Sequence, residues 1–383
     1  DVVRMHLGQV FHGNTIRSCH AIRVTRDSDL PVEEESSEDL MTTVEENLRD
    51  RRRGAAVRLQ YERGLDPELL DLLIQELELA AEDLYPTDGF AAFSDLMQLF
   101  AQLDLPHLKD PPMPPLPVPQ IERGGSIFEA IAKNDILLHH PFQSFDDSVV
   151  RFVREAAEDP KVLALKMTLY RMSASSPVAA ALERAAERGK QVAAIIELRA
   201  RFDEEANIAW ARRLEKAGVH VVYGLPNYKI HGKACLVVRM EQGGIRRYCH
   251  MGTGNYNERT SRIYSDLGMF TARPEFGEDL SQFFNFLTGY TRPPQFNRLI
   301  LAPQSFRRAI TERIEREGRH AQEGKPARMI LKMNALVDPH IIGMLYEASQ
   351  RGVQVDLIVR GSCCLKPGVP GLSENVRVKS IVG

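Results

Sequence analysis

The hydrophobic positions after residue 160 change spacing from one segment to the next. Short apolar runs predict strands over residues 162–170, 191–198 and 219–223, and amphipathic segments predict helices over 178–188 and 204–216 between them. Strands that alternate with helices are typical of an α/β layer whose neighbouring strands are parallel. We therefore expect a parallel sheet covered by helices in this part of the chain.

Two further strands should each run antiparallel to the strand that precedes it along the chain. Six residues separate Tyr223 from the apolar run over residues 230–238, which is too short for a parallel crossover. The turn Glu241–Gly244 then leads into a strand predicted for residues 246–251. The carboxyl ends of the parallel strands, the start of strand 230–238 and the end of strand 246–251 should meet at one sheet edge, which we call the rim. In open α/β sheets this edge is the usual ligand site.

The amino-terminal part of the chain predicts an α+β region. Strand-like segments cover residues 18–25 and 55–61, an acidic-to-basic helix is expected over 36–53, and a leucine-rich amphipathic helix over 67–85. The cations in the last turn of helix 36–53 complement the helix dipole, although a phosphate patch is the alternative. Six prolines between Asp110 and Pro119 then force an extended segment and mark a boundary.

The chain also contains a short internal repeat, which predicts two similar lobes. In the second lobe a strand over residues 355–359 would end at Arg360, again at a carboxyl rim, and another strand is expected over 376–382. The matching segments are Leu165-Lys-Met167 with Leu331-Lys-Met333, and Arg188-Gly-Lys-Gln-Val192 with Arg351-Gly-Val-Gln-Val355.

Composition limits the kinds of partner. A net charge of -3 over 383 residues indicates no general affinity for nucleic acid, so any anion site must be a local cluster. The five cysteines are scattered without CxxC spacing, which indicates neither a disulfide framework nor a zinc site and fits a reducing cytoplasm. No apolar run approaches the ~20 residues that span a bilayer.

The stretch Lys229-Ile-His-Gly-Lys233 sets His231 between two lysines. If this stretch is extended, the three basic side chains share one face. Two ammonium groups there disfavour protonation of the imidazole and attract an anion, which suits a neutral imidazole that attacks phosphorus. The alternative is a hydrogen-bonded histidine at a strand edge between two solvated lysines, and the stretch alone does not decide between the two. A metal site is disfavoured, because lysines repel a cation and no second histidine or cysteine stands at ligand spacing.

Further cations and a glycine-flanked loop are expected at the same rim. Arg171, Arg199 and Arg201 follow the ends of predicted parallel strands, and the loop Gly252–Asn257 follows strand 246–251. Arginine offers a planar fork to phosphate oxygens, and small turns let backbone N–H groups approach an anion. A single arginine is more often a surface ion-pair partner, but several cations that converge beside one histidine favour a phosphate site.

These residues form motifs that resemble a known family. An H-x-K strand followed by a G-T-G-N loop in a duplicated α/β lobe resembles the phospholipase D-like superfamily, which usually has an aspartate where this sequence has Val238. A phospholipase D-like phosphodiesterase is therefore kept as the alternative. The polyphosphate kinase family is a more specific resemblance, and it extends over nearly the whole chain. Its motifs are Leu169-Tyr-Arg171, Ala200–Asn207, Lys229–Lys233, Gly252–Asn257, Tyr264-Ser-Asp266, Arg23–Asp27, Arg51–Gly54 and Leu331–Asn334.

The resemblance implies an α/β fold with two phospholipase D-like lobes, the second truncated, preceded by part of an α+β head domain. Residues 1–117 would belong to the head domain, 118–298 would form the first catalytic lobe, and 299–383 would begin the second. An amino-terminal domain and the rest of the second lobe would then lie outside this sequence. The fragment is therefore expected to be inactive alone.

The resemblance also implies an activity: reversible transfer of the terminal phosphate of ATP to inorganic polyphosphate, with Mg²⁺ and a phosphohistidine at His231. Arg171 and Arg201 match the family's magnesium and phosphate positions. Because guanidinium has no lone pair to give, we interpret them as holding the phosphates that carry the metal. The expected phosphate and nucleotide contacts are Arg171, Arg201, Lys229, Lys233, Asn255, Tyr264 and Arg360.

The implied partners are ATP, ADP and polyphosphate, with no nucleic acid. The family resemblance further implies a homo-oligomer in the bacterial cytoplasm, with peripheral association at the inner face of the membrane. The same cluster of cations has a third interpretation, in which the protein is a non-enzymatic module that binds polyanions.

Overall fold

A computed structural model describes residues 2–27, 41–42, 44, 54–89, 95–111, 113–121, 124–198, 204–224, 228–289 and 295–381. The chain divides into two compact units, Asp1–Met113 and Pro114–Gly383. The division falls within the proline-rich segment that the sequence marks as a boundary. Among the described residues, no helix has both the length and the apolar character needed to cross a membrane.

The first unit is built on a small mixed sheet, in which β1 is antiparallel and β3 parallel to β2. Its leucine-rich helix is shorter than expected, because Glu78 ends it in the left-handed conformation, with φ at 54°, and the chain then forms β3. The leucines of this helix are exposed or only half-buried rather than core. Most of the expected helix 36–53 lies outside the described residues. The elements are α1 (Val2–Val10), β1 (Ile22–Arg26), β2 (Ala56–Glu62), α3 (Pro67–Leu77), η2 (Ala81–Asp83), β3 (Leu84–Thr87), α4 (Leu96–Gln102) and η4 (Pro106–Leu108).

The main sheet of the second unit has seven strands in the order β4-β10-β9-β8-β5-β6-β7. As expected, β5, β6 and β7 are parallel and β8 and β9 form an antiparallel pair. Strand β8 pairs antiparallel with β5, however, and not with β7, which precedes it along the chain. Two strands that the sequence had not indicated extend the sheet beyond β9. Strand β10 pairs antiparallel with β9, and β4 pairs antiparallel with β10. The strands are β4 (Ile136–His140), β5 (Val162–Leu169), β6 (Gln191–Ile196), β7 (His220–Val222), β8 (Lys233–Glu241), β9 (Gly244–Gly252) and β10 (Asp266–Thr271).

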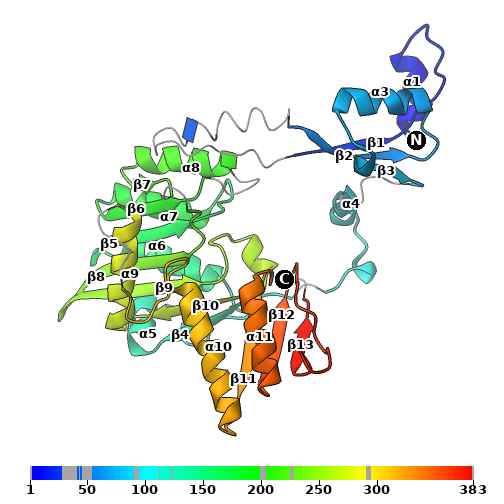
Figure 1. Cartoon of the computed structure of the whole chain (residues 1–383). Helices are drawn as coiled ribbons and strands as arrows, with labels where there is room; N and C mark the ends of the chain where they lie inside the picture. The colour runs from blue at the N-terminus through cyan, green and yellow to red at the C-terminus, as the bar shows by residue number, and fades with distance from the viewer. Residues whose placement is uncertain are drawn as a thin grey trace. The chain divides into compact units, whose positions relative to one another are not determined.

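Helices cover both faces of this sheet (Figure 1). On one face, Leu280 and Phe284 of α9 pack with Leu236 of β8 and Cys249 of β9. On the other, aromatic side chains of α5 and α6 meet aromatic side chains of β9 and β10. The helices are α5 (Ile127–Lys133), the π-helical turn η5 (Asp146–Val150), α6 (Arg151–Glu158), α7 (Pro177–Glu187), α8 (Glu204–Lys216), η6 (Thr260–Arg262) and α9 (Pro274–Leu287).

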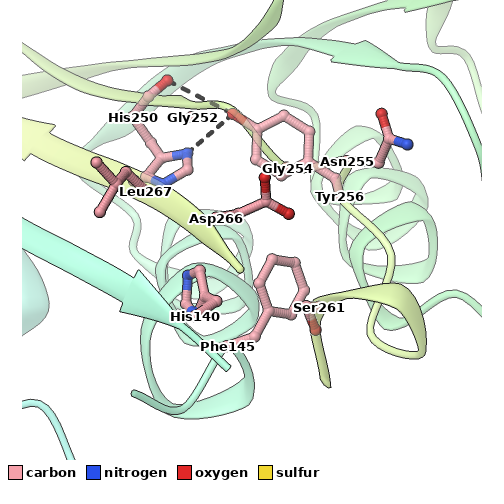
Figure 2. Close-up of a pocket in the computed structure, with 11 residues that line it drawn as sticks. His140, Phe145, His250, Gly252, Gly254, Asn255, Tyr256, Ser261, Asp266 and Leu267 are labelled. Atoms are coloured by element: carbon pink, nitrogen blue, oxygen red, sulfur yellow. Dashed lines mark hydrogen bonds between the residues drawn. The ribbon is translucent and has the colours of Figure 1, made fainter. Parts of the chain in front are cut away.

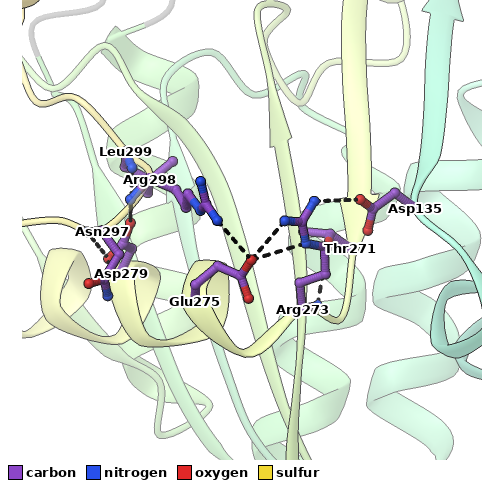
Figure 3. A network of polar contacts seen from close by, with 8 residues as sticks. All are labelled: Asp135, Thr271, Arg273, Glu275, Asp279, Asn297, Arg298 and Leu299. Atoms are coloured by element: carbon purple, nitrogen blue, oxygen red, sulfur yellow. Dashed lines mark hydrogen bonds and ion pairs between the residues drawn. The ribbon is translucent and has the colours of Figure 1, made fainter.

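A buried carboxylate ties α9 to the segment that leads into the second lobe. Asp279 is fully buried and accepts hydrogen bonds from the backbone N–H groups of Asn297, Arg298 and Leu299, at 2.8, 2.7 and 2.9 Å (Figure 3). Three charge-assisted bonds to one carboxylate compensate it for the loss of water. The beginning of the second lobe is therefore fixed against the first.

The second lobe repeats the parallel β-α-β unit of the first. Its strands follow the order β11-β12-β13, all parallel, and α10 lies beside α11 on the sheet (Figure 1). The repeat is offset in register by two residues, since Val192 pairs with Leu165 whereas its counterpart Val355 pairs with Met329. The elements are α10 (Phe306–Gln322), β11 (Arg328–Met333), α11 (Pro339–Gln350), β12 (Gln354–Val359) and β13 (Val376–Lys379).

Candidate functional site

The backbone on either side of His231 is held by buried side chains from neighbouring strand ends. The N–H of Ile230 donates to Glu197 Oε2 at 2.7 Å, just beyond β6, instead of joining a strand ladder. The N–H of Ala234 donates to the hydroxyl of Thr168 in β5 at 3.0 Å. Strand β8 therefore begins three residues later than expected, and the histidine lies in the irregular segment before it.

An aromatic ring lies at the centre of the basic cluster. The Tyr170 ring, which directly follows β5, meets the His231 ring edge-on, with 5.3 Å between centroids and 81° between planes. Lys233 Nζ, Arg171 Cζ and Lys229 Nζ lie 5.1, 5.8 and 6.0 Å from the centroid of the tyrosine ring. The histidine and both lysines therefore surround one ring, which agrees with the shared face expected for an extended chain. Contacts of cations with a π face at this range are attractive.

The surroundings keep the imidazole of His231 neutral. Burial lowers its pKa from 6.5, and the positive charges of Lys233, Lys229 and Arg171 lower it further. The sign follows from the charged form, because both desolvation and neighbouring cations penalise imidazolium. At neutral pH the ring therefore carries a lone pair within a field that attracts anions.

Lys233 is the most buried cation of the group, at 7% exposure. Burial lowers the pKa of its ammonium to about 8, with a further lowering by Arg171 and an opposing contribution from Asp266. Its Nζ also donates to the carbonyl oxygen of His231. A lysine with a pKa of about 8 is only partly charged near that pH, and a bound anion would raise its pKa and so its charge.

The loop Gly252–Asn257 is anchored to the arginine at the end of β5. Asn257 is 6% exposed, and its Oδ1 accepts from the N–H groups of Arg259 and Thr260, both at 3.0 Å. Its Nδ2 donates to the carbonyl oxygen of Arg171 at 3.4 Å. The glycine-rich loop and the basic cluster are therefore parts of one structure.

The same loop lies tightly against Asp266 at the start of β10. The Thr253 hydroxyl donates to Asp266 Oδ1 at 2.7 Å. A Cβ atom at Gly254 would lie 2.5 Å from Asp266 Oδ2 and 2.9 Å from its Cβ. Only glycine fits beside this carboxylate, which explains the second glycine of the loop.

Two residues of the site were not assigned a role from the sequence. Asn207, fully buried in α8, donates to the carbonyl oxygens of Tyr170 and Glu197 at 2.8 and 2.9 Å and accepts from the N–H of Met172 at 3.2 Å. It thus joins the ends of β5 and β6. Both Asn207 and Tyr170 lie within the quoted motifs, and that membership is the only signal in the sequence that could have found them.

We expect Tyr170→Leu in the full-length protein to slow the phosphorylation of His231 that the family resemblance implies by about 10-fold, because the cations around the ring lose attractions of roughly 0.5–1 kcal/mol each. Tyr170→Phe keeps the ring and should stay within about twofold of wild type. Rapid-quench measurement of enzyme labelling by ATP compares the two. Equal rates for Tyr170→Leu and Tyr170→Phe would show that the aromatic ring of Tyr170 does not contribute.

The remaining candidate residues divide into three groups. Arg199 and Arg201 lie outside the described residues. Asn255 lines a small buried cavity beside the rim. The guanidinium carbon of Arg360 lies 5.0 Å from the centroid of the Tyr264 ring, so the second lobe reaches the first at this point. Among the described residues, neither Asn255 nor Arg360 belongs to the set of side chains around the Tyr170 ring.

The described side chains around His231 are not direct ligands for Mg²⁺, which we expect the phosphates to carry. Among the described parts of the chain there is no group of three or more His, Cys, Asp or Glu side chains that could hold a metal ion. Mg²⁺ takes oxygen ligands, whereas the histidine is surrounded by ammonium and guanidinium groups. The described residues therefore offer the metal no direct ligand set there.

Three profiles of one family match consecutive parts of the chain. They are the polyphosphate kinase middle domain over residues 1–99, C-terminal domain 1 over 126–293 and C-terminal domain 2 over 299–383. Polyphosphate kinases of Thermosynechococcus vestitus and Synechocystis are 47% and 49% identical to the whole chain, which covers 56% and 55% of their lengths. The chain thus spans about half of these relatives.

A solved structure agrees with this assignment. The crystal structure of polyphosphate kinase from Porphyromonas gingivalis matches the whole chain with a TM-score of 0.78 and 34% identity, over 57% of its own length. The expected fold class, α/β lobes preceded by an α+β region, is confirmed by this match. By profile, sequence and fold, the chain belongs to the polyphosphate kinase family.

Proposed function

We propose that the full-length protein transfers the terminal phosphate of ATP reversibly to inorganic polyphosphate, with His231 as the covalent carrier. The observation that carries this proposal is a neutral imidazole among three cations, Lys229, Lys233 and Arg171. A nucleophile needs its lone pair, and a polyanionic substrate needs positive charge. The cluster supplies both at one point of the rim.

The reaction would proceed in two balanced steps. A ring nitrogen of His231 forms a bond to the γ-phosphorus of ATP while the bond from that phosphorus to the bridging oxygen breaks, and ADP leaves with the electron pair. The terminal oxygen of polyphosphate then attacks the phosphorus, and the N–P bond breaks. Because the phosphoryl group passes through the histidine, ATP and polyphosphate need not both contact the transferred phosphorus in the same step.

The cations would neutralise charge on the transferred phosphoryl group. Lys233 and Lys229 act as point charges, and Arg171 presents a planar fork to two phosphate oxygens. Mg²⁺ would enter as part of the nucleotide substrate, since the described residues give it no ligand set. Tyr264, Arg360, Asn255 and Arg201 are kept as nucleotide and phosphate contacts on the family resemblance. The cytoplasmic location, the homo-oligomer and the peripheral membrane association have the same basis.

Labelling chemistry separates this proposal from its alternatives. The full-length protein given γ-labelled ATP should acquire label that is labile in acid and stable in alkali, as a phosphoramidate is. Adding ADP or polyphosphate should remove it. Acid-stable label would contradict a histidine carrier, and binding of polyphosphate without labelling would indicate a polyanion-binding module.

The phosphodiesterase alternative is disfavoured by one position in β8. Val238 pairs with Ala164 of β5 and packs against the apolar cluster that contains Leu236 and Phe284. Val238 is half-buried, so a carboxylate at this place would be partly removed from water against apolar neighbours, which disfavours its charge. Cleavage of a phosphodiester without ATP would nevertheless restore that alternative.

We expect Arg171→Lys to slow transfer although the charge is kept. Losing one charge-assisted bidentate contact should cost about 1.5–3 kcal/mol, which is roughly 10- to 100-fold in rate if the contact is made in the transition state. Steady-state kinetics with ATP and polyphosphate measure it. Kinetics like those of wild type would place the guanidinium outside the reacting phosphate.

A further inference from the structure

The second lobe contacts the first at two adjacent residues that lie just before β10. The guanidinium carbon of Arg360 lies 5.0 Å from the centroid of the Tyr264 ring. Lys332 Nζ of β11 donates a hydrogen bond to the carbonyl oxygen of Ser265 at 2.6 Å. A ring contact alone lets the ring slide beneath the guanidinium, whereas a second contact at the next residue restricts that movement.

Lys332 and Arg360 belong to one rigid frame. Strands β11 and β12 are paired in parallel along their whole lengths. The backbone N–H of Arg360, directly after β12, also donates to the carbonyl oxygen of Met333 in β11 at 3.1 Å. A shift of Lys332 relative to Ser265 therefore moves Arg360 relative to Tyr264.

The first lobe holds the same segment from its own side. The Ser265 hydroxyl lies 3.3 Å from Nε2 of His139 in β4. The next residue, Asp266, lies beside Gly254 of the glycine-rich loop (Figure 2). Its negative charge also opposes the lowering of the pKa of Lys233 by burial. The segment over residues 264–266 therefore connects the second lobe to the basic cluster.

The internal repeat shows that this contact differs from the one made by the corresponding lysine of the first lobe. In the repeated Leu-Lys-Met segments, Lys332 corresponds to Lys166 of β5. Lys166 is half-buried, and its Nζ donates to Asn285 Oδ1 of α9 at 3.2 Å, within its own lobe. Lys332 is exposed and reaches the first lobe instead. The lysine of the second lobe therefore makes a contact between lobes.

We propose that Lys332 is a positioning residue, which holds the segment over residues 264–266 against the second lobe and so keeps Arg360 over the Tyr264 ring. Contacts that are in place before a ligand arrives reduce the entropy that is lost on binding. The effect on ATP rests on the proposed function, in which Tyr264 and Arg360 contact the nucleotide. The anchoring of the segment does not rest on it.

Hydrogen exchange of the full-length protein without substrate tests the anchoring. The backbone N–H groups of Tyr264 and Leu267 are each hydrogen-bonded at 3.0 Å, so their exchange reports opening of the segment. We expect Lys332→Met to speed exchange in the peptide over residues 263–268 by about two- to tenfold, the equivalent of one hydrogen bond. Exchange in β5 should stay as in wild type.

Two further variants complete this measurement. Lys332→Arg keeps a cationic donor and should exchange at close to the wild-type rate. Lys325→Met is the matched control, because it removes the same charge from an exposed position of the same lobe, where Lys325 pairs with Glu323. Equal exchange in Lys332→Met and Lys325→Met would overturn the anchoring.

Kinetics with ATP test the positioning role. Lys332→Met should raise KM for ATP by about two- to tenfold with a smaller change in kcat, and Lys332→Arg should restore most of the affinity. In a protein that already carries Arg360→Met, Lys332→Met should change KM by less than about twofold, because the contact that it positions is absent. Effects that multiply in the double variant, or a KM for Lys332→Met equal to that of Lys325→Met, would contradict the positioning role.

The two measurements separate this inference from the proposed function. Faster exchange in Lys332→Met, together with a KM for ATP that Arg360→Met leaves unchanged, would support the anchoring and overturn the nucleotide role of Arg360. Unchanged exchange in Lys332→Met, together with a raised KM in Arg360→Met, would overturn the anchoring and support the nucleotide contact.

Discussion

Replacing His231 with glutamine in the full-length protein is expected to reduce ATP-dependent polyphosphate synthesis by roughly 10³-fold or more, as for loss of a covalent nucleophile. Glutamine keeps a polar side chain of similar length but has no ring nitrogen that can hold a phosphoryl group. Product formation and enzyme labelling should disappear together.

The matched control is His220→Gln, which changes an exposed histidine of β7. It should retain wild-type synthesis and labelling. Synthesis by His231→Gln above about a tenth of the wild-type rate would show that phosphate passes directly between substrates, since removal of a true covalent carrier leaves far less.

The second large effect concerns Lys233 and pH. Its pKa of about 8 means that the ammonium loses its charge as pH rises through 8. The value of kcat/KM for ATP should therefore fall on the alkaline side near pH 8, because this ratio reports ionisation in the free enzyme. On the acid side the rate should persist below pH 6.5, because the pKa of His231 is lowered and the ring stays neutral.

Two substitutions of Lys233 separate charge from titration. Lys233→Arg carries a guanidinium that stays protonated, so the alkaline limb should move to higher pH. Lys233→Met should lose roughly 100-fold below pH 8, because a charge-assisted contact of about 3 kcal/mol is removed, and the difference from wild type should shrink above pH 8, where the wild-type amine is neutral. An alkaline limb that is the same in wild type and Lys233→Arg would assign the titration to another group.

The sequence predicted the parallel part of the fold well and the antiparallel part less well. Strands β5, β6 and β7 come from apolar runs separated by amphipathic helices, and this alternation has few other structural solutions. The start of β8 was placed too early, because the N–H of Ile230 bonds to the Glu197 side chain instead of a ladder. Sequence periodicity contains no information about such a contact.

The candidate site also consists of one part that the sequence predicted and another that it did not. Local spacing was sufficient to place Lys229, His231 and Lys233 together, because an extended chain alternates its side chains. The Tyr170 ring between them and the Asn207 amide that joins two strand ends come from distant segments. Their roles depend on how strands and helices pack, and residue spacing does not specify that packing.

Mass spectrometry of the full-length protein after brief exposure to ATP tests the central claim most directly. Digestion at alkaline pH, followed by fragmentation that preserves the N–P bond, locates the phosphate on a peptide. We predict a phosphate on His231 that disappears when ADP or polyphosphate is added. A phosphate on another residue, or turnover with no phosphate on His231, would contradict the account.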